Sequence, residues 1–269
     1  RQEFTAPEIL RTNLAAVILQ MLELDLGELD DFDFIDTPDS AVVRDGYRLL
    51  KELSAVTSTG RLTSTGRDML AFPIDPALAR IVVAARKENC LEELLVIVSA
   101  MSIQDPRERP IEKVSMADEM HSRFLHPKSD FLSWLQLWIY FEDRRRSLSE
   151  NRLRVLCRRE FLSFSRMREW RDIHKQLVII CRAKGERFSR QLKIKGNYRA
   201  IHVSILTGLL SNIAMRETGK EYIAARKRRV NLFPGSATYK KPPRWIVSGE
   251  IMETSKVFAL SAAEINPNW

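Results

Sequence analysis

Apolar residues recur at intervals of three and four through most of the chain, which is the spacing of amphipathic helices. The pattern predicts helices near residues 10–24, 40–53, 78–85, 91–101, 130–141, 152–176 and 200–214. Residues 81–84 and 94–98 are apolar almost all round, which indicates burial on more than one side. The aromatic residues Phe131, Trp134, Trp138 and Tyr140 have the spacing of a helix core rather than that of a binding platform.

The pattern changes to alternation near the C-terminus. From Gly219 onward we expect strands, with Trp245 and Val247 on one face and Ile246 and Ser248 on the other. The run Arg226, Lys227, Arg228 and Arg229 would place charge on both faces of a strand, so it must lie at a surface or rim. The predicted fold class is therefore multidomain and mainly α, with a small C-terminal β-barrel.

Prolines and glycines suggest where the domains divide. The sequence Phe-Pro-Ile-Asp-Pro at 72–76 cannot be helical and predicts a linker. Before it, the sequence predicts two or three helices, an acidic loop at 30–36 and a short hairpin at 57–65, with Gly60 and Gly66 bracketing Leu62. Together these elements predict a winged helix. We expect a winged-helix domain at 1–72, a helical domain at 73–216 and the barrel at 217–269.

Charge is distributed unevenly along the chain. The net charge is +8, yet residues 1–140 carry about −8 and residues 141–269 about +16 when the printed sequence is counted. A basic half attracts polyanions through counterion release. The alternative is that the acidic half only balances the basic one. The arginine-rich stretch at 144–171 could likewise hold phosphates or only be solvated.

Composition limits the cellular setting and the chemistry. Three cysteines and four histidines show no ligand spacing, which argues against a disulfide framework or a metal site. No apolar run approaches the ~18 residues of a membrane span, and no signal peptide is evident, so we expect a cytoplasmic protein without a membrane partner. The chain starts without methionine, which suggests a piece of a longer protein.

Catalytic motifs are missing from the sequence. It has no phosphate-binding loop, and Gly219-Lys220 lacks the flanking residues that such a loop needs. The sequence Asp-Glu-Met-His at 118–121 resembles a helicase magnesium motif, but no buried strand leads into it, and we interpret it as coincidence. We therefore expect neither catalytic residues nor a bound cofactor in this piece.

The order of several short motifs does resemble a known family. The chain is similar to the region that follows the two motor lobes in DEAH-box (RHA-type) ATP-dependent RNA helicases. The motifs are Thr-Ala-Pro-Glu-Ile at 5–9, Asp-Phe-Asp-Phe-Ile-Asp-Thr-Pro at 31–38, Leu-Thr-Ser-Thr-Gly at 62–66, Phe-Pro-Ile-Asp-Pro-Ala-Leu-Ala-Arg at 72–80, Ser-Asp-Phe-Leu at 129–132, Thr-Ser-Lys at 254–256 and Ile-Asn-Pro-Asn-Trp at 265–269.

This resemblance implies a winged helix, a helical ratchet (HA2) domain and an OB-fold barrel that together close a tunnel around single-stranded RNA. It also implies 3′ to 5′ translocation driven by ATP and Mg²⁺ in RecA-like motor lobes of the same polypeptide, so this piece alone should be inactive. Three positions depart from the family. Phe-Pro-Gly-Ser at 233–236 replaces His-Pro-Ser-Ser, Leu260 replaces an arginine, and Ile173-His174 replaces Ile-Arg.

The resulting hypothesis is that the piece binds single-stranded RNA, with DNA as an alternative ligand. The expected contacts are Arg226, Lys227, Arg228, Arg229, Ser236, Lys240, Lys241, Arg244, Thr254, Ser255 and Lys256 in the barrel, and Ser129 and Asp130 in the ratchet. The basic hairpin could instead be merely solvated. A second hypothesis is a protein-docking scaffold for the motor lobes, a ribosome or another ribonucleoprotein. A third, a winged-helix transcription factor, is disfavoured because Asp45 and Glu52 offset the cations of the second helix.

Overall fold

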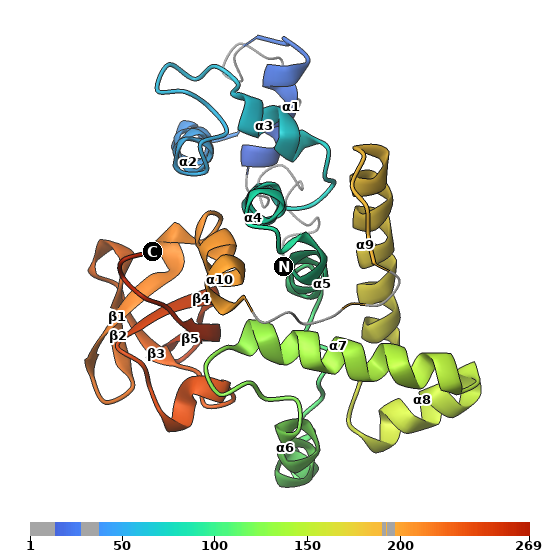
Figure 1. Cartoon of the computed structure of the whole chain (residues 1–269). Coiled ribbons are helices and arrows are strands. Elements are labelled where there is room, and N and C mark those ends of the chain that lie inside the picture. Colours follow the sequence, from blue (N-terminus) through green and yellow to red (C-terminus); the bar gives the residue numbers. More distant parts are fainter. Residues whose placement is uncertain (1–13, 28–37, 190–191, 193–196) are drawn as a thin grey trace, which may run out of the picture. The chain divides into compact units, whose positions relative to one another are not determined.

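The computed structural model describes residues 14–27, 38–189, 192 and 197–269. The chain forms two compact units, residues 1–84 and 85–269. The described residues contain ten α-helices, followed by five strands that close a barrel (Figure 1). This confirms a mainly helical chain with a C-terminal β-barrel. The first residues of the helix predicted near 10–24 and the acidic loop at 30–36 lie outside the described residues.

The first unit packs α1 (Ala15–Glu23) against α2 (Ser40–Glu52). The Asp39 carboxylate caps α2 by accepting from the Ala41 amide at 2.7 Å. The two helices approach closely at Gly46, where an added Cβ would lie 2.7 Å from the Ile18 side chain. Ile18, Val43 and Leu50 are buried, so the predicted apolar stripes do form the core of this unit.

The segment predicted as a wing is only partly extended. One antiparallel bridge joins Val56 to Leu62, and the chain then enters α3 (Ser64–Leu70). The hairpin is therefore shorter than the predicted 57–65, because the Thr63 side chain caps a helix there by accepting from the Gly66 amide at 3.0 Å. The winged-helix assignment and the domain limits at 72 and 216 stay predictions. Helix α4 (Pro76–Lys87) follows the proline-rich linker.

The helices of the second unit are built around α5 (Leu91–Met101), which contacts both α7 (Asp130–Ser147) and α9 (Phe164–Ala183). Residues 94–100 of α5 are all buried, which includes the predicted stretch 94–98. Phe131, Trp134 and Trp138 of α7 are buried core residues, and Tyr140 is half-buried. The stretch predicted as one or two helices forms two, α8 (Glu150–Arg159) and α9. Helices α6 (Val114–Ser122) and α10 (Tyr198–Leu206) complete this part.

The barrel consists of β1 (Ile213–Thr218), β2 (Glu221–Ala224), β3 (Arg229–Leu232), β4 (Trp245–Glu253) and β5 (Val257–Glu264). The strand order is β1-β2-β3-β5-β4, with β3 and β5 parallel and the other pairs antiparallel. Its interior is filled by Ala214, Tyr222, Val230, Leu232 and Ile246, with small residues contributed by β5.

The structure corrects two details of the predicted barrel. The helix expected to reach residue 214 ends at Leu206, and the first strand starts at Ile213 rather than after Gly219. Gly219 is the turn between β1 and β2, where it adopts a φ of 51°. The first half of β4 is buried on both faces, because Ile246 points into the barrel while Gly249, on the other face, lies close to Phe131 of α7.

No helix in the described part of the chain is both long enough and apolar enough to cross a membrane.

Candidate nucleic-acid interface

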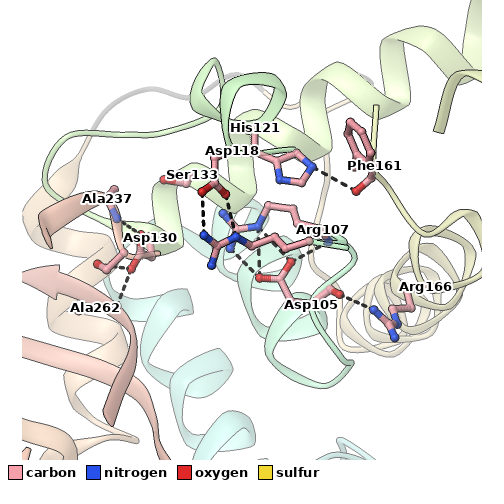
Figure 2. Close-up of polar contacts among 12 residues, drawn as sticks. Asp105, Arg107, Asp118, His121, Asp130, Ser133, Phe161, Arg166, Ala237 and Ala262 are labelled. Carbon is pink, nitrogen blue, oxygen red and sulfur yellow. Dashed lines mark hydrogen bonds and ion pairs between the residues drawn. The ribbon is translucent and has the colours of Figure 1, made fainter. Parts of the chain in front are cut away.

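The barrel is held to the helical part of its unit by the start of α7. Asp130 is 3% exposed, and its carboxylate accepts from the Ser236 hydroxyl at 2.6 Å and from the amides of Ala237 and Ala262 at 2.8 Å each (Figure 2). Burial raises the pKa of Asp130, although these three donors oppose the rise. One carboxylate therefore joins α7 to the loop after β3 and to β5.

Ser129 strengthens the same junction. Its backbone bridges to Ala263 of β5, and its hydroxyl lies 2.8 Å from Nε2 of His202 on α10. His202 is fully buried, and burial lowers its pKa to about 4. Three predicted contacts, Ser129, Asp130 and Ser236, therefore lie inside the protein. Their side chains face each other or other buried groups and hold the barrel in place, and their predicted contact with an RNA strand stays a prediction.

The predicted cations divide into two groups. The β2–β3 turn holds Arg226 and Lys227 in a 3-10 helix, η5 (Ala225–Lys227), and not in the strand that the sequence suggests. Both residues adopt a φ of 58°, so the chain turns sharply there. The β4–β5 turn lies at the same end of the barrel, because Arg228 forms an ion pair with Glu253 at 3.0 Å. We call Arg226, Lys227, Arg228, Arg229, Thr254, Ser255 and Lys256 the turn group.

The second group lies on the loop between β3 and β4, which contains the 3-10 helix η6 (Ala237–Lys240). This loop reaches the opposite end of β2, since the Arg216 side chain at the end of β1 donates to the Pro242 carbonyl at 2.5 Å. Lys220, which the sequence analysis missed, places Nζ 3.4 Å from the centre of the Tyr239 ring. We call Lys220, Lys240, Lys241 and Arg244 the loop group. The four residues of β2 separate the two groups by roughly 13 Å.

The two groups differ in how well their charges are paired. In the turn group, Arg228 pairs with Glu253, and Arg229 lies 3.8 Å from a carboxylate oxygen of Glu217. In the loop group, no carboxylate lies within ion-pair distance of a cation in the part of the chain that the structure describes. All four loop-group cations are exposed. An exposed cation without a carboxylate partner can neutralise a phosphate, and so release a counterion from the nucleic acid, without first breaking an ion pair. The loop group is therefore the stronger candidate for binding phosphate.

A cavity of about 780 Å³ adjoins the loop group. Phe233, Tyr239 and Lys240 line it from the barrel side, and Met101 and Leu125 line it from the helical side. Two of the three departures from the helicase pattern, at 233–236 and at 260, lie on this wall. Gly235 is packed under the Phe233 ring, where an added Cβ would come within 2.7 Å of a ring carbon, so a larger residue at 235 would force that ring to shift. Leu260, in place of the family's arginine, also lines the cavity.

The far wall of the cavity is a rigid polar network. Arg107 binds the Asp105 carboxylate through two nitrogens, at 3.0 and 2.6 Å, and Arg166 donates to the Asp105 carbonyl (Figure 2). Burial alone would raise the pKa of Asp105, but the Arg107 guanidinium outweighs burial and lowers that pKa. The sequence alone does not predict this network, because residues 104–110 contain two prolines and charges of both signs but no recognisable motif.

The Asp-Glu-Met-His sequence on α6 has structural contacts. Asp118 forms a two-nitrogen ion pair with Arg109, both bonds being 2.7 Å, and His121 contacts the carbonyls of Glu160 and Phe161 at 3.1 Å. Glu119 and Met120 are exposed. The four residues therefore do not converge on one site.

Two segments of the chain match known domains. Residues 75–134 match the helicase associated domain (HA2), described as ratchet-like, and residues 201–269 match the oligonucleotide/oligosaccharide-binding (OB) fold. A ratchet-like helical segment followed by an OB-fold barrel defines the class of protein, the accessory region of a helicase. The motifs of the sequence and these two domains agree: the chain carries the accessory domains of the DEAH-box RNA helicases.

Three relatives show the same likeness over nearly the whole chain. It is 46% identical over 275 residues to the ATP-dependent RNA helicase HrpA of Escherichia coli and 44% identical over 277 residues to the HrpA homolog of Haemophilus influenzae, each alignment covering 100% of this chain. It is 29% identical over 266 residues, 98% of the chain, to the pre-mRNA-splicing factor ATP-dependent RNA helicase prp22 of Schizosaccharomyces pombe. The chain spans only 21% to 22% of these relatives.

Proposed function

We propose that this chain is the accessory module of an ATP-dependent RNA helicase and that its barrel binds single-stranded RNA through the loop group. ATP and Mg²⁺ would act in motor lobes elsewhere in a longer polypeptide. The similarity to proteins named ATP-dependent RNA helicases supports the setting, and the match to an oligonucleotide-binding fold supports a nucleic-acid ligand.

The observation that carries this proposal is the set of unpaired cations at one end of the barrel. Lys240, Lys241 and Arg244 are exposed and within five residues of each other in sequence. Phosphates of a flexible strand can neutralise such cations in turn. Phe233 and Tyr239 lie beside them on the cavity wall, and a base that leaves the strand could stack there.

The turn group would make a weaker second contact. Arg226, Lys227 and Lys256 have no carboxylate partner among the described residues, whereas Arg228 and Arg229 already face acids. An RNA strand that crosses β2 would span roughly 13 Å between the two groups, which is a short distance for an extended single-stranded nucleic acid. The proposal also includes three roles of the longer protein: closing a tunnel over the motor lobes, translocation from 3′ to 5′, and docking to a ribonucleoprotein.

The test is to neutralise the loop group without altering the fold. The variant Lys240→Gln, Lys241→Gln, Arg244→Gln should bind a labelled single-stranded RNA at least tenfold more weakly at low salt, because each neutralised phosphate contact contributes to the binding free energy. The matched control Arg44→Gln, Lys51→Gln, Arg61→Gln removes three exposed cations from the first unit and should bind like the wild type.

Equal affinity of the wild type and the loop-group variant would sink the direct-contact proposal. It would favour the second candidate, a scaffold that holds the motor lobes without touching RNA. An equal loss in both triple variants would show that only net charge matters.

A further inference from the structure

Helix α8 carries an arginine face that the barrel site leaves unexplained. Its ten residues, Glu150–Arg159, include four arginines and one acid. Leu153 and Cys157 are buried against the neighbouring helices, so the exposed side carries Arg152, Arg154, Arg158 and Arg159 around Val155, which is 65% exposed. The helix packs against both α7 and α9, and this fixes the direction in which the arginines point.

Three of these arginines have no acidic partner among the described residues. Arg154 is paired with Glu150 at 3.4 Å and lies over the Phe164 ring, whereas Arg152, Arg158 and Arg159 form no ion pair. The next acid along the chain, Glu160, is buried and turned inward, where it binds Arg123 and Tyr140. The charge of the face is therefore left open to solvent.

Helix stability does not account for this arrangement. Arg158 and Arg159 lie in the last turn, where a cation interacts favourably with the helix dipole, but Arg152 lies in the first turn, where a cation is unfavourable. The three arginines extend over about 10 Å along one rigid helix at 1.5 Å per residue. The arrangement suits a partner with a regular row of negative charge.

The start of α8 lies at the end of α7 that is far from the barrel. Helix α7 starts at Asp130, on the barrel, and ends at Ser147, just before α8 (Figure 1). At 1.5 Å per residue its 18 residues extend about 27 Å. The Debye length in 0.15 M salt is about 8 Å, so the start of α8 is about three Debye lengths from the start of α7. The other end of α8 is closer to the cavity, because residues 160–162, which follow Arg159, contact His121 and Arg107 on the cavity wall. Separate variants are therefore needed to tell the two surfaces apart.

We propose that Arg152, Arg158 and Arg159 of α8 bind the phosphate backbone of double-stranded RNA. Single-strand sites combine cations with exposed rings on which bases stack, and α8 contains no aromatic residue. A ring-free row of cations on a rigid helix suits a duplex, whose bases are stacked inside and whose phosphates are fixed in place. An acidic protein fits less well, because Val155 is the one exposed large apolar residue of α8, while protein interfaces have apolar centres. The inference goes beyond the proposed function and does not require the barrel contact.

The experiment compares a short blunt-ended RNA duplex with an unpaired strand, each followed by fluorescence anisotropy across a salt series. The variant Arg152→Gln, Arg158→Gln, Arg159→Gln should lose three phosphate contacts to the duplex. Its plot of log affinity against log salt should flatten by about 2.7. Between 50 and 200 mM salt the wild type would then lose roughly 40-fold more duplex affinity than the variant. Single-strand affinity should not change.

Two further variants separate charge from structure. Arg152→Lys, Arg158→Lys, Arg159→Lys keeps the charge and should keep most of the duplex affinity, while circular dichroism confirms equal helicity for both triple variants. The loop-group glutamine variant should show the reverse behaviour, with weaker single-strand binding and unchanged duplex binding.

Unchanged duplex affinity in the α8 glutamine variant would overturn the proposal, and so would an equal loss of duplex and single-strand affinity. If polyglutamate bound to the wild type and not to that variant, while duplex binding stayed the same, the partner would be an acidic protein and the duplex assignment would be wrong. A loop-group variant that kept full single-strand affinity would count against the barrel contact alone.

Discussion

Replacing Asp130 by alanine tests the junction that positions the barrel. The substitution removes one acceptor group from three donors: the Ser236 hydroxyl and the amides of Ala237 and Ala262. Ser236 keeps a second partner in the Thr238 hydroxyl at 2.9 Å, but no other acceptor is recorded for the two amides. The Asp130→Ala substitution also removes an acid from the first turn of α7, where a negative charge interacts favourably with the helix dipole.

The expected cost follows from these contacts. A buried donor left without an acceptor costs about 1 to 3 kcal/mol, and two amides are affected. Relief of the buried charge offsets part of that loss, because burying a carboxylate is itself unfavourable. We expect Asp130→Ala to lower the free energy of holding the barrel in place by about 2 to 5 kcal/mol. Ser236→Ala should cost about 1 kcal/mol, since it removes a single hydroxyl.

Native-state hydrogen exchange is the appropriate assay, because it reports on each amide separately. In Asp130→Ala the amides of Ala237 and Ala262 should exchange at least 30-fold faster, since 2 kcal/mol corresponds to about that factor. Amides in α9 should change much less. The control Asp143→Ala removes an exposed acid from the same helix and should leave all of these rates unchanged. Unaltered protection at Ala237 and Ala262 in Asp130→Ala would refute this account of the junction.

Three more predictions follow from buried groups. Burial lowers the pKa of His202 to about 4. The stability that this histidine contributes, about 3 kcal/mol, is therefore present above pH 6.5 and is lost as the pH falls toward 4. In urea titrations, the free energy of unfolding should fall less steeply at acid pH for His202→Gln than for the wild type. Gly66→Ala should lower Tm, because its Cβ would lie 2.3 Å from the Ala55 carbonyl oxygen; an unchanged Tm would mean that α3 shifts freely. Burial raises the pKa of the thiols of Cys90, Cys157 and Cys181 to about 11. These thiols should therefore react with iodoacetamide only after denaturation, and fast labelling of the native protein would contradict their burial.

Periodicity predicted the parts of the fold that depend on local burial. The apolar residues of α5 and the aromatic residues of α7 are core because helical spacing places them on faces that neighbouring helices cover. The barrel was predicted from alternation, but its first strand was missed. The predicted helix was extended through Gly208 and Ser211-Asn212 to residue 214, because Leu209, Leu210 and Ile213 keep the chain apolar, although a glycine just past a helix and a Ser-Asn pair are stop and turn signals.

The candidate site was predicted less well, because it depends on which residues meet across long sequence distances. Charge density identified Lys240, Lys241 and Arg244, yet it gave Arg226 and Arg228 equal weight and could not show that Glu253 pairs with Arg228. Asp130 and Ser236 looked like surface contacts, since nothing in the sequence shows that they bond to each other across 106 positions. Lys220 could have been found by treating every cation near the predicted barrel as a candidate.

The salt dependence of single-strand binding tests the central claim most directly. For single strands the slope of log affinity against log salt is about −0.7 per phosphate contact, so removing Lys240, Lys241 and Arg244 should flatten the slope by about 2. The control with three neutral substitutions in the first unit should keep the wild-type slope. If both variants keep it, the loop group does not touch the RNA strand, and the proposal that the barrel binds RNA through this group is wrong.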